Sequence, residues 1–177
     1  MPINHSIHDK ISIFVLHGFP IFGTKLKIEP MTIKELNDFC RNTLISHLEI
    51  EFLDYGSDYV LARMPVNNKK VQPMGILHGG ATLALAETVA SVGSFLLIDR
   101  EKYTTRGLQV SGNHVSAVRD GDVFARAQII HKGQMTHIWE VKITNSEQKP
   151  VSFVRVTMIV LDIEQLKKKE GSINETR

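Results

Sequence analysis

Glu87 is the side chain of this sequence that is best placed to do chemistry. Between Gly75 and Ile98 the only ionisable side chains are His78 and Glu87, and alanine, leucine and valine dominate the segment. Burying a carboxylate in such surroundings is costly unless the charge is paired or neutralised. Burial raises the pKa of a carboxylate toward the range in which it can serve as a base or an acid near neutral pH. The alternatives are that Glu87 emerges at a helix surface or pairs with an arginine from a strand.

Three residues at the start of the same segment, His78, Gly79 and Gly80, could bind a substrate through the backbone. Glycine lets a ligand approach the chain closely, and the first N–H groups of a helix lack internal partners. A carbonyl oxygen held there would be polarised as it is in an oxyanion hole. The simpler interpretation is a loop that starts a helix, with His78 as a capping or packing residue.

Ser91, Asn113 and His114 are weaker candidates. Ser91 lies one helical turn after Glu87 and could hydrogen-bond to it, to a water or to a substrate. Asn113 and His114 stand in an alternating segment, where a cross-strand hydrogen-bonded pair is the simpler interpretation. The histidines and the lone cysteine lack zinc-ligand spacing, and we find no phosphate-binding glycine loop or serine-nucleophile motif. The sequence therefore predicts neither a metal nor a cofactor.

Composition narrows the class of protein. The 177 residues are 42% hydrophobic and 23% charged, which suits one globular domain with a real core. A formal net charge of +2 is too small to indicate nucleic-acid or membrane binding. Cys40 is the single cysteine, so no internal disulfide can form. We expect a reducing, cytoplasmic compartment.

Two helices are expected to position these residues. Thr32 and Glu35 form a capping-box pattern, which predicts a short amphipathic helix over Ile33–Leu44. Its apolar face would carry Leu36, Phe39, Cys40 and Leu44. The segment Ala81–Ile98 contains no proline and is apolar all round, which predicts one long buried helix.

Six strands are expected around that helix. Their boundaries follow alternating hydrophobicity and turn residues. They are predicted at Leu48–Leu53, Tyr59–Met64, Gly107–Val118, Asp122–His131, Thr136–Thr144 and Val151–Leu161. This order favours an α+β fold in which an antiparallel sheet wraps around a long central helix.

The expected domain spans residues 31–162. Residues 1–30 form an extension of unknown role, and residues 163–177 form a flexible tail, with a frayed helix from Glu164 and then disorder. The apolar run Ile11–Leu16 is too short to span a bilayer. An extra strand or a poorly packed extension is favoured over a signal peptide.

Several short motifs together resemble those of the hotdog-fold acyl-CoA thioesterases of the phenylacetate-pathway and hydroxybenzoyl-CoA type. These include dihydroxynaphthoyl-CoA hydrolases and the proofreading thioesterases of enterobactin synthesis. The resemblance spans about Met31 to Leu161. It rests on Gln72-Pro-Met-Gly-Ile-Leu-His-Gly-Gly-Ala81, Glu87 through Ser91, Gly107-Leu-Gln, Asn113-His-Val, Arg119-Asp-Gly121, and His131-Lys-Gly133 to His137-Ile-Trp139.

The resemblance implies hydrolysis of an aromatic or medium-chain acyl-CoA. Glu87 would act as nucleophile or as general base toward water, a choice that the family leaves open. The N–H of Gly79 would polarise the thioester carbonyl, and Gln72 and His78 would orient it or assist the leaving thiolate. The expected substrate-binding residues are Gly80, Ser91, Asn113, His114, Arg119, Gly133 and His137.

The resemblance also implies a homo-oligomer. In this family the site straddles a dimer interface, so His78 and Glu87 of one site would come from different subunits, and dimers commonly pair into tetramers. The coenzyme A phosphates would meet Arg119 and the turn Lys132–His137.

Two departures concern the ligand. Where close relatives often carry arginine after Asn-His-Val, this chain has Ser116, and the turn Gly133–Thr136 lacks the arginine often found there. The sequence therefore leaves two properties of the substrate open: the identity of the acyl group, and whether the thioester is formed with coenzyme A or with a carrier protein. Two other functions are weighed: a hotdog hydratase or dehydratase, and a non-catalytic acyl-CoA-binding protein. The spacing from His78 to Glu87 resembles that of the thioesterases more than that of the hotdog hydratases and dehydratases.

Overall fold

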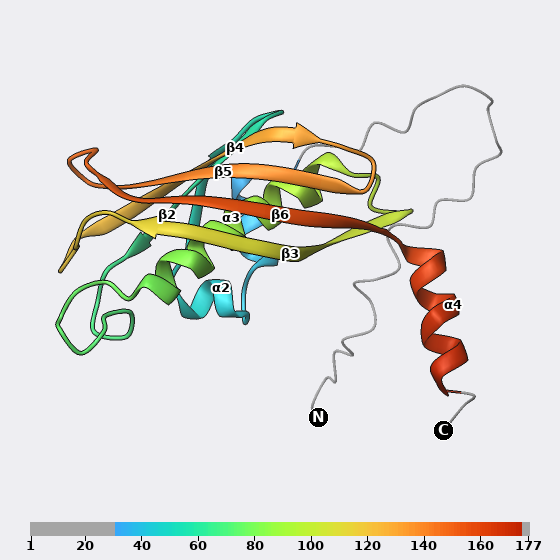
Figure 1. The fold of residues 1–177 in the computed structure, drawn as a ribbon, viewed down its shortest axis with the longest axis horizontal. Coiled ribbons are helices and arrows are strands. Elements are labelled where there is room, and N and C mark those ends of the chain that lie inside the picture. The colour runs from blue at the N-terminus through green and yellow to red at the C-terminus, as the bar shows by residue number, and fades with distance from the viewer. Residues whose placement is uncertain (1–30, 175–177) are drawn as a thin grey trace, which may run out of the picture.

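The computed structural model describes residues 31–174 (Figure 1). They form four helices and six strands. In chain order these are α1 (Ile33–Phe39), α2 (Leu44–His47), β1 (Glu51–Tyr55), β2 (Tyr59–Pro65), α3 (Gly79–Leu97), β3 (Tyr103–His114), β4 (Asp122–Lys132), β5 (Thr136–Asn145), β6 (Pro150–Asp162) and α4 (Ile163–Asn174).

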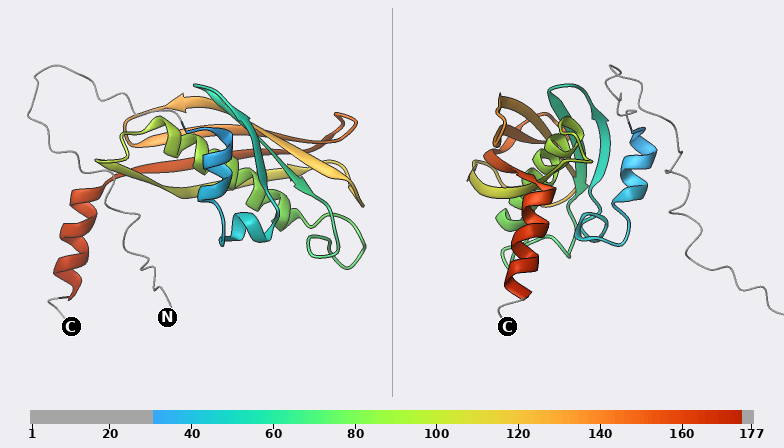
Figure 2. Two further views of the ribbon diagram at one scale, coloured as in Figure 1. Left: turned by 180° about the vertical axis from the view of Figure 1, so that it is seen from behind. Right: turned by 90° about the vertical axis from the view of Figure 1, so that its right-hand side faces the viewer.

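The six strands form one sheet in the order β1-β2-β4-β5-β6-β3, and every neighbouring pair is antiparallel. The sheet curves around α3, which runs along its inner face (Figures 1 and 2). This arrangement confirms the expected α+β architecture, an antiparallel sheet wrapped around a long central helix.

Helix α3 supplies the centre of the core. Leu85, Ala86, Val89 and Ala90 are completely buried, because strands on several sides of the helix pack against it. By length and composition alone this helix could cross a membrane. In this fold it is the core helix, and the enclosing sheet explains why its sequence lacks a polar stripe.

The two edges of the sheet differ. At the β1 edge, the Asn37 side chain of α1 donates to the Phe52 carbonyl and accepts from the Phe52 N–H, both at 2.9 Å. Strand β3, at the other edge, is bonded within the described residues only to β6. It carries a bulge at Leu108, whose side chain is 59% exposed. One edge is thus closed by α1, whereas the outer edge of β3 has no strand partner within residues 31–174.

The expected helix over Ile33–Leu44 is wrong in its extent. Helix α1 ends at Phe39, and Asn42 adopts a left-handed conformation with φ 59°. Thr43 then caps the separate short helix α2. Of the four residues assigned to one apolar face, Leu36 and Cys40 are buried, whereas Phe39 and Leu44 are exposed.

Strands β1 and β3 are displaced from their expected positions. The chain at Leu48 still caps α2, and Glu49 has φ 55°, so β1 begins only at Glu51. Strand β3 begins four residues earlier than expected and ends at His114. Beyond His114 the regular pairing with β6 ends, although the Val115 N–H still donates to the Val151 carbonyl at 2.8 Å. The Val118 carbonyl accepts instead from the N–H of Leu77 at 2.7 Å.

The other boundaries agree with expectation to within two residues, and a helix, α4, is present where a frayed one was expected. The expected extension at residues 1–30, including Ile11–Leu16, lies outside the described residues. So does the disorder expected at the chain end, at residues 175–177.

Candidate active site

His78 is the N-cap of α3. Its ring Nδ1 accepts from the N–H of Gly80 at 2.8 Å, and its carbonyl accepts from the N–H of Ala81 at 3.0 Å. Because Nδ1 is the acceptor, a neutral ring carries its proton on Nε2. Within residues 31–174, the N–H of Gly79 has no hydrogen-bond partner. The first N–H of the helix is therefore free to bind a ligand oxygen.

Gln72 lies on a small hairpin, residues 70–78, that leads into α3. Its N–H donates to the Ile76 carbonyl at 2.8 Å, and its side-chain oxygen accepts from the N–H of Met74 at 2.6 Å. With the oxygen engaged in this way, the side-chain NH₂ is the part of the amide that remains to donate.

A cleft of about 400 Å³ opens between this hairpin, the N-terminus of α3 and the chain around the end of β3. Three expected site residues, Gln72, Gly79 and His114, lie on its wall. The other lining residues are Ile76, Leu77, Thr82, Val115, Ser116, Ala117, Val151 and Ser152. The cleft therefore brings together two free N–H donors and an imidazole.

His114 is held against the start of α3. Its Nδ1 lies 2.7 Å from the Ser152 hydroxyl oxygen. Its Nε2 lies 2.7 Å from the point where a Cβ on Gly79 would stand. A side chain at position 79 would collide with the imidazole, so glycine is needed there for this close approach.

Glu87 lies outside this cleft. Glu87 stands eight positions after Gly79 in α3, which is about 12 Å along the helix axis. The half-buried Glu87 side chain points at Gly107 of β3, where an added Cβ would overlap its carboxylate oxygen. Within residues 31–174 it makes no hydrogen bond or ion pair with another side chain. Glu87 is thus half-buried and not fully at the helix surface. The other alternative, an ion pair with an arginine of a strand, is not found within residues 31–174.

Ser91 lies one helical turn beyond Glu87, toward the C-terminus of α3. Its hydroxyl contacts the Met158 sulfur at 3.6 Å. Gly80 is exposed at the helix start, with its N–H given to His78.

The remaining expected residues are spread over the molecule. Arg119 is near the cleft, because its guanidinium lies 3.5 Å from the Met74 carbonyl at the hairpin tip. Asn113 lies on the outer face of the sheet, in a groove that it shares with Gln109 and Ser111. The side chains of Asn113 and His114 therefore face opposite sides of β3. For His114 the expected cross-strand pair is present, because its Nδ1 lies 2.7 Å from the hydroxyl of Ser152, its register partner on β6.

Gly133 and His137 lie at the far end of the sheet. Register places Thr136 opposite Ile159, whereas His114 is opposite Ser152 at the other end of β6. His137 is only 2% exposed and its Nδ1 has no partner. Burial, followed by the charges of Lys132 and His131, lowers the pKa of the His137 imidazole.

Two cleft residues were missed at the level of sequence. Ser152 fixes His114 across the β3–β6 pair, and Thr82 is a buried hydroxyl on the cleft wall. Thr82 follows the glycines by one turn and could have been found from helical spacing. Ser152 is 38 residues from His114, and only the strand register brings the two together.

These features are suited to two separate parts of acyl-transfer chemistry, at different places along α3. Free N–H groups at the cleft can stabilise a developing oxyanion, and a carboxylate elsewhere can deliver a nucleophile. Within residues 31–174, no three His, Cys, Asp or Glu side chains lie close enough to hold a metal ion.

The curved sheet, the enclosed helix and the cleft at its N-terminus define a hotdog-fold protein. Solved structures of the same fold include a thioesterase from Pseudomonas aeruginosa, 34% identical, with a TM-score of 0.75 over 77% of this chain and 98% of that one. A thioesterase from Haemophilus influenzae is 39% identical, with a TM-score of 0.72 over 75% and 92%. One from Staphylococcus aureus is 39% identical, with a TM-score of 0.65 over 66% and 97%.

Curated relatives agree with these structures. A proofreading thioesterase of Cronobacter turicensis is 36% identical over 74% of this chain and 95% of its own length. The 1,4-dihydroxy-2-naphthoyl-CoA hydrolase of Escherichia coli is 32% identical over 74% and 96%. The thioesterase superfamily profile matches residues 74–152. The chain belongs to the thioesterase superfamily, and it is a hotdog-fold thioesterase, as its motifs predict.

Proposed function

We propose that this protein hydrolyses an aromatic or medium-chain acyl-CoA, with Glu87 as nucleophile or as general base toward water. The observation that carries the proposal is the composition of α3: a free N–H and a cleft at its start, and one unpaired, half-buried carboxylate in its middle. Hydrolysis needs both parts, an oxyanion site and a group that attacks or activates water.

The two parts are too far apart to act on one thioester within a single chain. About 12 Å separates Gly79 from Glu87 along the helix, whereas reacting atoms must approach to about 3–3.5 Å. Glu87 lies against Gly107 of the edge strand β3. A second copy that pairs through β3 would bring its own cleft toward this carboxylate. We therefore propose a homodimer in which Gln72, His78 and Gly79 of one subunit face Glu87 of the other. Pairing of two such dimers into a tetramer is part of the same expectation.

The relatives support these roles. Structures of the Staphylococcus aureus protein were solved with one glutamine, or one glutamate, replaced by alanine, and these two residues stand fifteen positions apart. Gln72 and Glu87 have the same separation here. The E. coli relative is named for an aromatic acyl-CoA, which favours an aromatic acyl group.

The place of coenzyme A is proposed from charge. Arg119 is exposed beside the hairpin tip at the cleft, where it can meet a phosphate. Gly133 and the turn around it stand near the start of β3, so a partner's turn would approach the same cleft in an antiparallel β3–β3 pair. Because His137 is buried, we assign it a role beneath that turn and not in direct contact with substrate. With Cys40 buried and unpaired, we propose a cytoplasmic location.

The test is release of free thiol from aromatic, short-chain and long-chain acyl-CoA substrates. Glu87→Ala should lower turnover at least about a hundredfold, the size expected for a lost general base, with an unchanged unfolding midpoint. Thr88→Ala, one residue on, is the matched control and should remain active. Gly107→Ala should also lower turnover, because its methyl group takes the space of the Glu87 carboxylate. Full activity in Glu87→Ala would remove Glu87 from the mechanism.

A further inference from the structure

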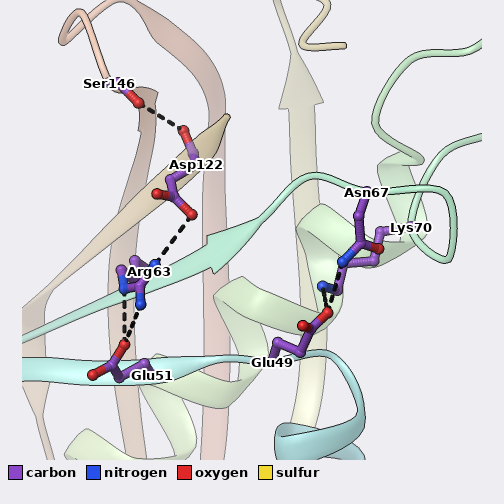
Figure 3. Close-up of polar contacts among 7 residues, drawn as sticks. All are labelled: Glu49, Glu51, Arg63, Asn67, Lys70, Asp122 and Ser146. Atoms are coloured by element: carbon purple, nitrogen blue, oxygen red, sulfur yellow. Dashed lines mark hydrogen bonds and ion pairs between the residues drawn. The ribbon is translucent and has the colours of Figure 1, made fainter. Parts of the chain in front are cut away.

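A lysine next to the candidate site is completely buried. Lys70 opens the hairpin of residues 70–78, and its side chain has no exposed surface. A buried ammonium is strongly disfavoured without a partner. Its partner is Glu49, which lies in the link between α2 and β1, with the Lys70 nitrogen 2.5 Å from the Glu49 carboxylate oxygen (Figure 3).

The same carboxylate oxygen also accepts from the Asn67 side-chain amide at 2.7 Å (Figure 3). The backbone N–H of Lys70 donates to the Asn67 carbonyl at 2.9 Å, closing a tight turn. Glu49 therefore binds both ends of the turn that enters the hairpin. Hydrogen bonds from Lys70 and then Asn67 lower the pKa of the Glu49 carboxyl, so this carboxylate stays charged at neutral pH.

The backbone of Lys70 leads directly to the cleft. Its carbonyl accepts from the N–H of His78 at 2.8 Å, which joins the base of the hairpin to the N-cap of α3. One arm of the hairpin carries Gln72, and the other ends at Gly79. Apart from this ion pair, the hydrogen bond from Leu77 N–H to Val118 is the link that ties the hairpin to the rest of the described chain near its base.

We propose that the Lys70–Glu49 ion pair is a positioning device for thioester hydrolysis, fixing the hairpin so that Gln72 and the N–H of Gly79 converge on the substrate carbonyl. This inference rests on the proposed function. Lys70 and Glu49 touch no substrate and act through the backbone of residues 70–78. Oxyanion donors act mainly in the transition state, so loss of the pair lowers kcat more than it raises KM.

The neighbouring residue offers a matched control. Lys69 is exposed and bears the same charge on the same turn. Its side chain has no ion pair among the described residues. Lys69→Met removes an equal charge without touching the buried pair. A second control is Glu51→Gln, which breaks the partly exposed Glu51–Arg63 pair in the same region of the fold (Figure 3).

The experiment compares Lys70→Met, Glu49→Gln, Lys70→Arg and the two controls in the full chain. Turnover of the best acyl-CoA substrate and hydrogen exchange of the amides in residues 71–79 are both measured. We expect kcat to fall about ten- to a hundredfold in Lys70→Met and Glu49→Gln, as for a small misplacement of catalytic groups. KM should change less than about threefold, because uniform binding is retained. Amide exchange at residues 71–79 should accelerate in these two variants alone, and Lys70→Arg should recover part of both properties.

The double variant Lys70→Met/Glu49→Met guards against a simple folding defect. Removing both charges leaves no unpaired buried ion, so stability should recover while kcat stays low, because the hairpin is still untethered. Unchanged exchange at residues 71–79 in Lys70→Met would overturn the proposal, and so would recovery of full kcat in the double variant. Exchange is read without substrate, so a protein that hydrolyses no thioester would refute the proposed function while leaving this positioning role testable.

Discussion

Close contacts at single atoms govern the candidate site. A Cβ at position 79 would strike His114, and one at position 107 would strike Glu87. These glycines are not in left-handed conformations, so backbone freedom does not explain them. Their role is to leave room for an imidazole at the cleft and for a carboxylate behind β3. His114 and Glu87 therefore each occupy space that a side chain at the neighbouring glycine would fill.

His137 links stability to pH at the residue scale. Its folded-state pKa lies below the unfolded value of 6.5, so the unfolded chain binds the proton more readily. The buried neutral imidazole therefore contributes fully to the free energy of unfolding at pH values above the unfolded-state pKa. This contribution is lost as the pH falls toward the lower folded-state pKa. We expect the urea midpoint to decrease between about pH 7.5 and pH 5.5, and His137→Leu to flatten that decrease.

The exposed neighbour His131 provides the control for this measurement. His131→Gln keeps the buried imidazole and should retain most of the slope. An identical pH dependence in the wild type and in His137→Leu would show that other groups set it.

At the scale of elements, the close packing of α3 against β5 at Gly93 and Trp139 contributes to the stability of the fold. Gly93 brings the helix against Trp139, whose ring would lie 2.5 Å from an added Cβ. The indole N–H donates to the Ser94 hydroxyl at 2.9 Å in the buried core. Helix and strand can approach this closely only because position 93 has no side chain.

Gly93→Ala should therefore destabilise the fold by about 1–3 kcal/mol, the usual cost of overpacking a core. Ser94→Ala should cost about 1 kcal/mol through the lost hydrogen bond. Chemical denaturation followed by fluorescence measures both, since Trp139 is the only tryptophan of the chain. A fully stable Gly93→Ala variant with unchanged emission would mean that α3 and β5 can separate without cost.

Elements with a strong local pattern could be predicted from the sequence. The long apolar run gave α3 to within two residues, and alternation located β4, β5 and β6 equally well. The helix from Ile33 and the ends of β3 were misplaced. Neither boundary follows from the local hydrophobic pattern. The helix ends near Asn42, which has a left-handed conformation, and β3 ends close to the point where the chain stops bonding to β6 and bonds to Leu77.

The candidate site also has features that the sequence predicts and features that it does not. Motifs predicted Gln72, Gly79 and His114 as site residues, and the fold places these three on the wall of one cleft. The contacts that hold them were not found, because Ser152 and Glu49 are distant in sequence from His114 and Lys70. Periodicity carries no information about which distant side chains will meet, and an isolated Lys70 reads as an ordinary surface lysine.

At the scale of the whole molecule, the proposed mechanism requires a second chain. The cleft proposed to bind the oxyanion and the Glu87 carboxylate lie in different places, and within residues 31–174 the outer edge of β3 has no strand partner. A two-fold axis beside β3 would resolve both features at once, because an isologous contact presents each cleft to the other subunit's Glu87. We therefore predict that two variants, each inactive alone, complement each other in a mixed dimer.

Glu87→Ala and Gln72→Ala chains, each inactive alone, should form active mixed dimers when they are co-expressed with different tags. A mixed dimer contains one site with both defects and one with neither. Random pairing makes half of the dimers mixed, so the mixture should recover about a quarter of wild-type activity. Purification through both tags should raise this to about half, because every dimer then has one intact site. If the two residues served the same site from within one chain, every site would keep a defect and the doubly tagged dimer would stay inactive.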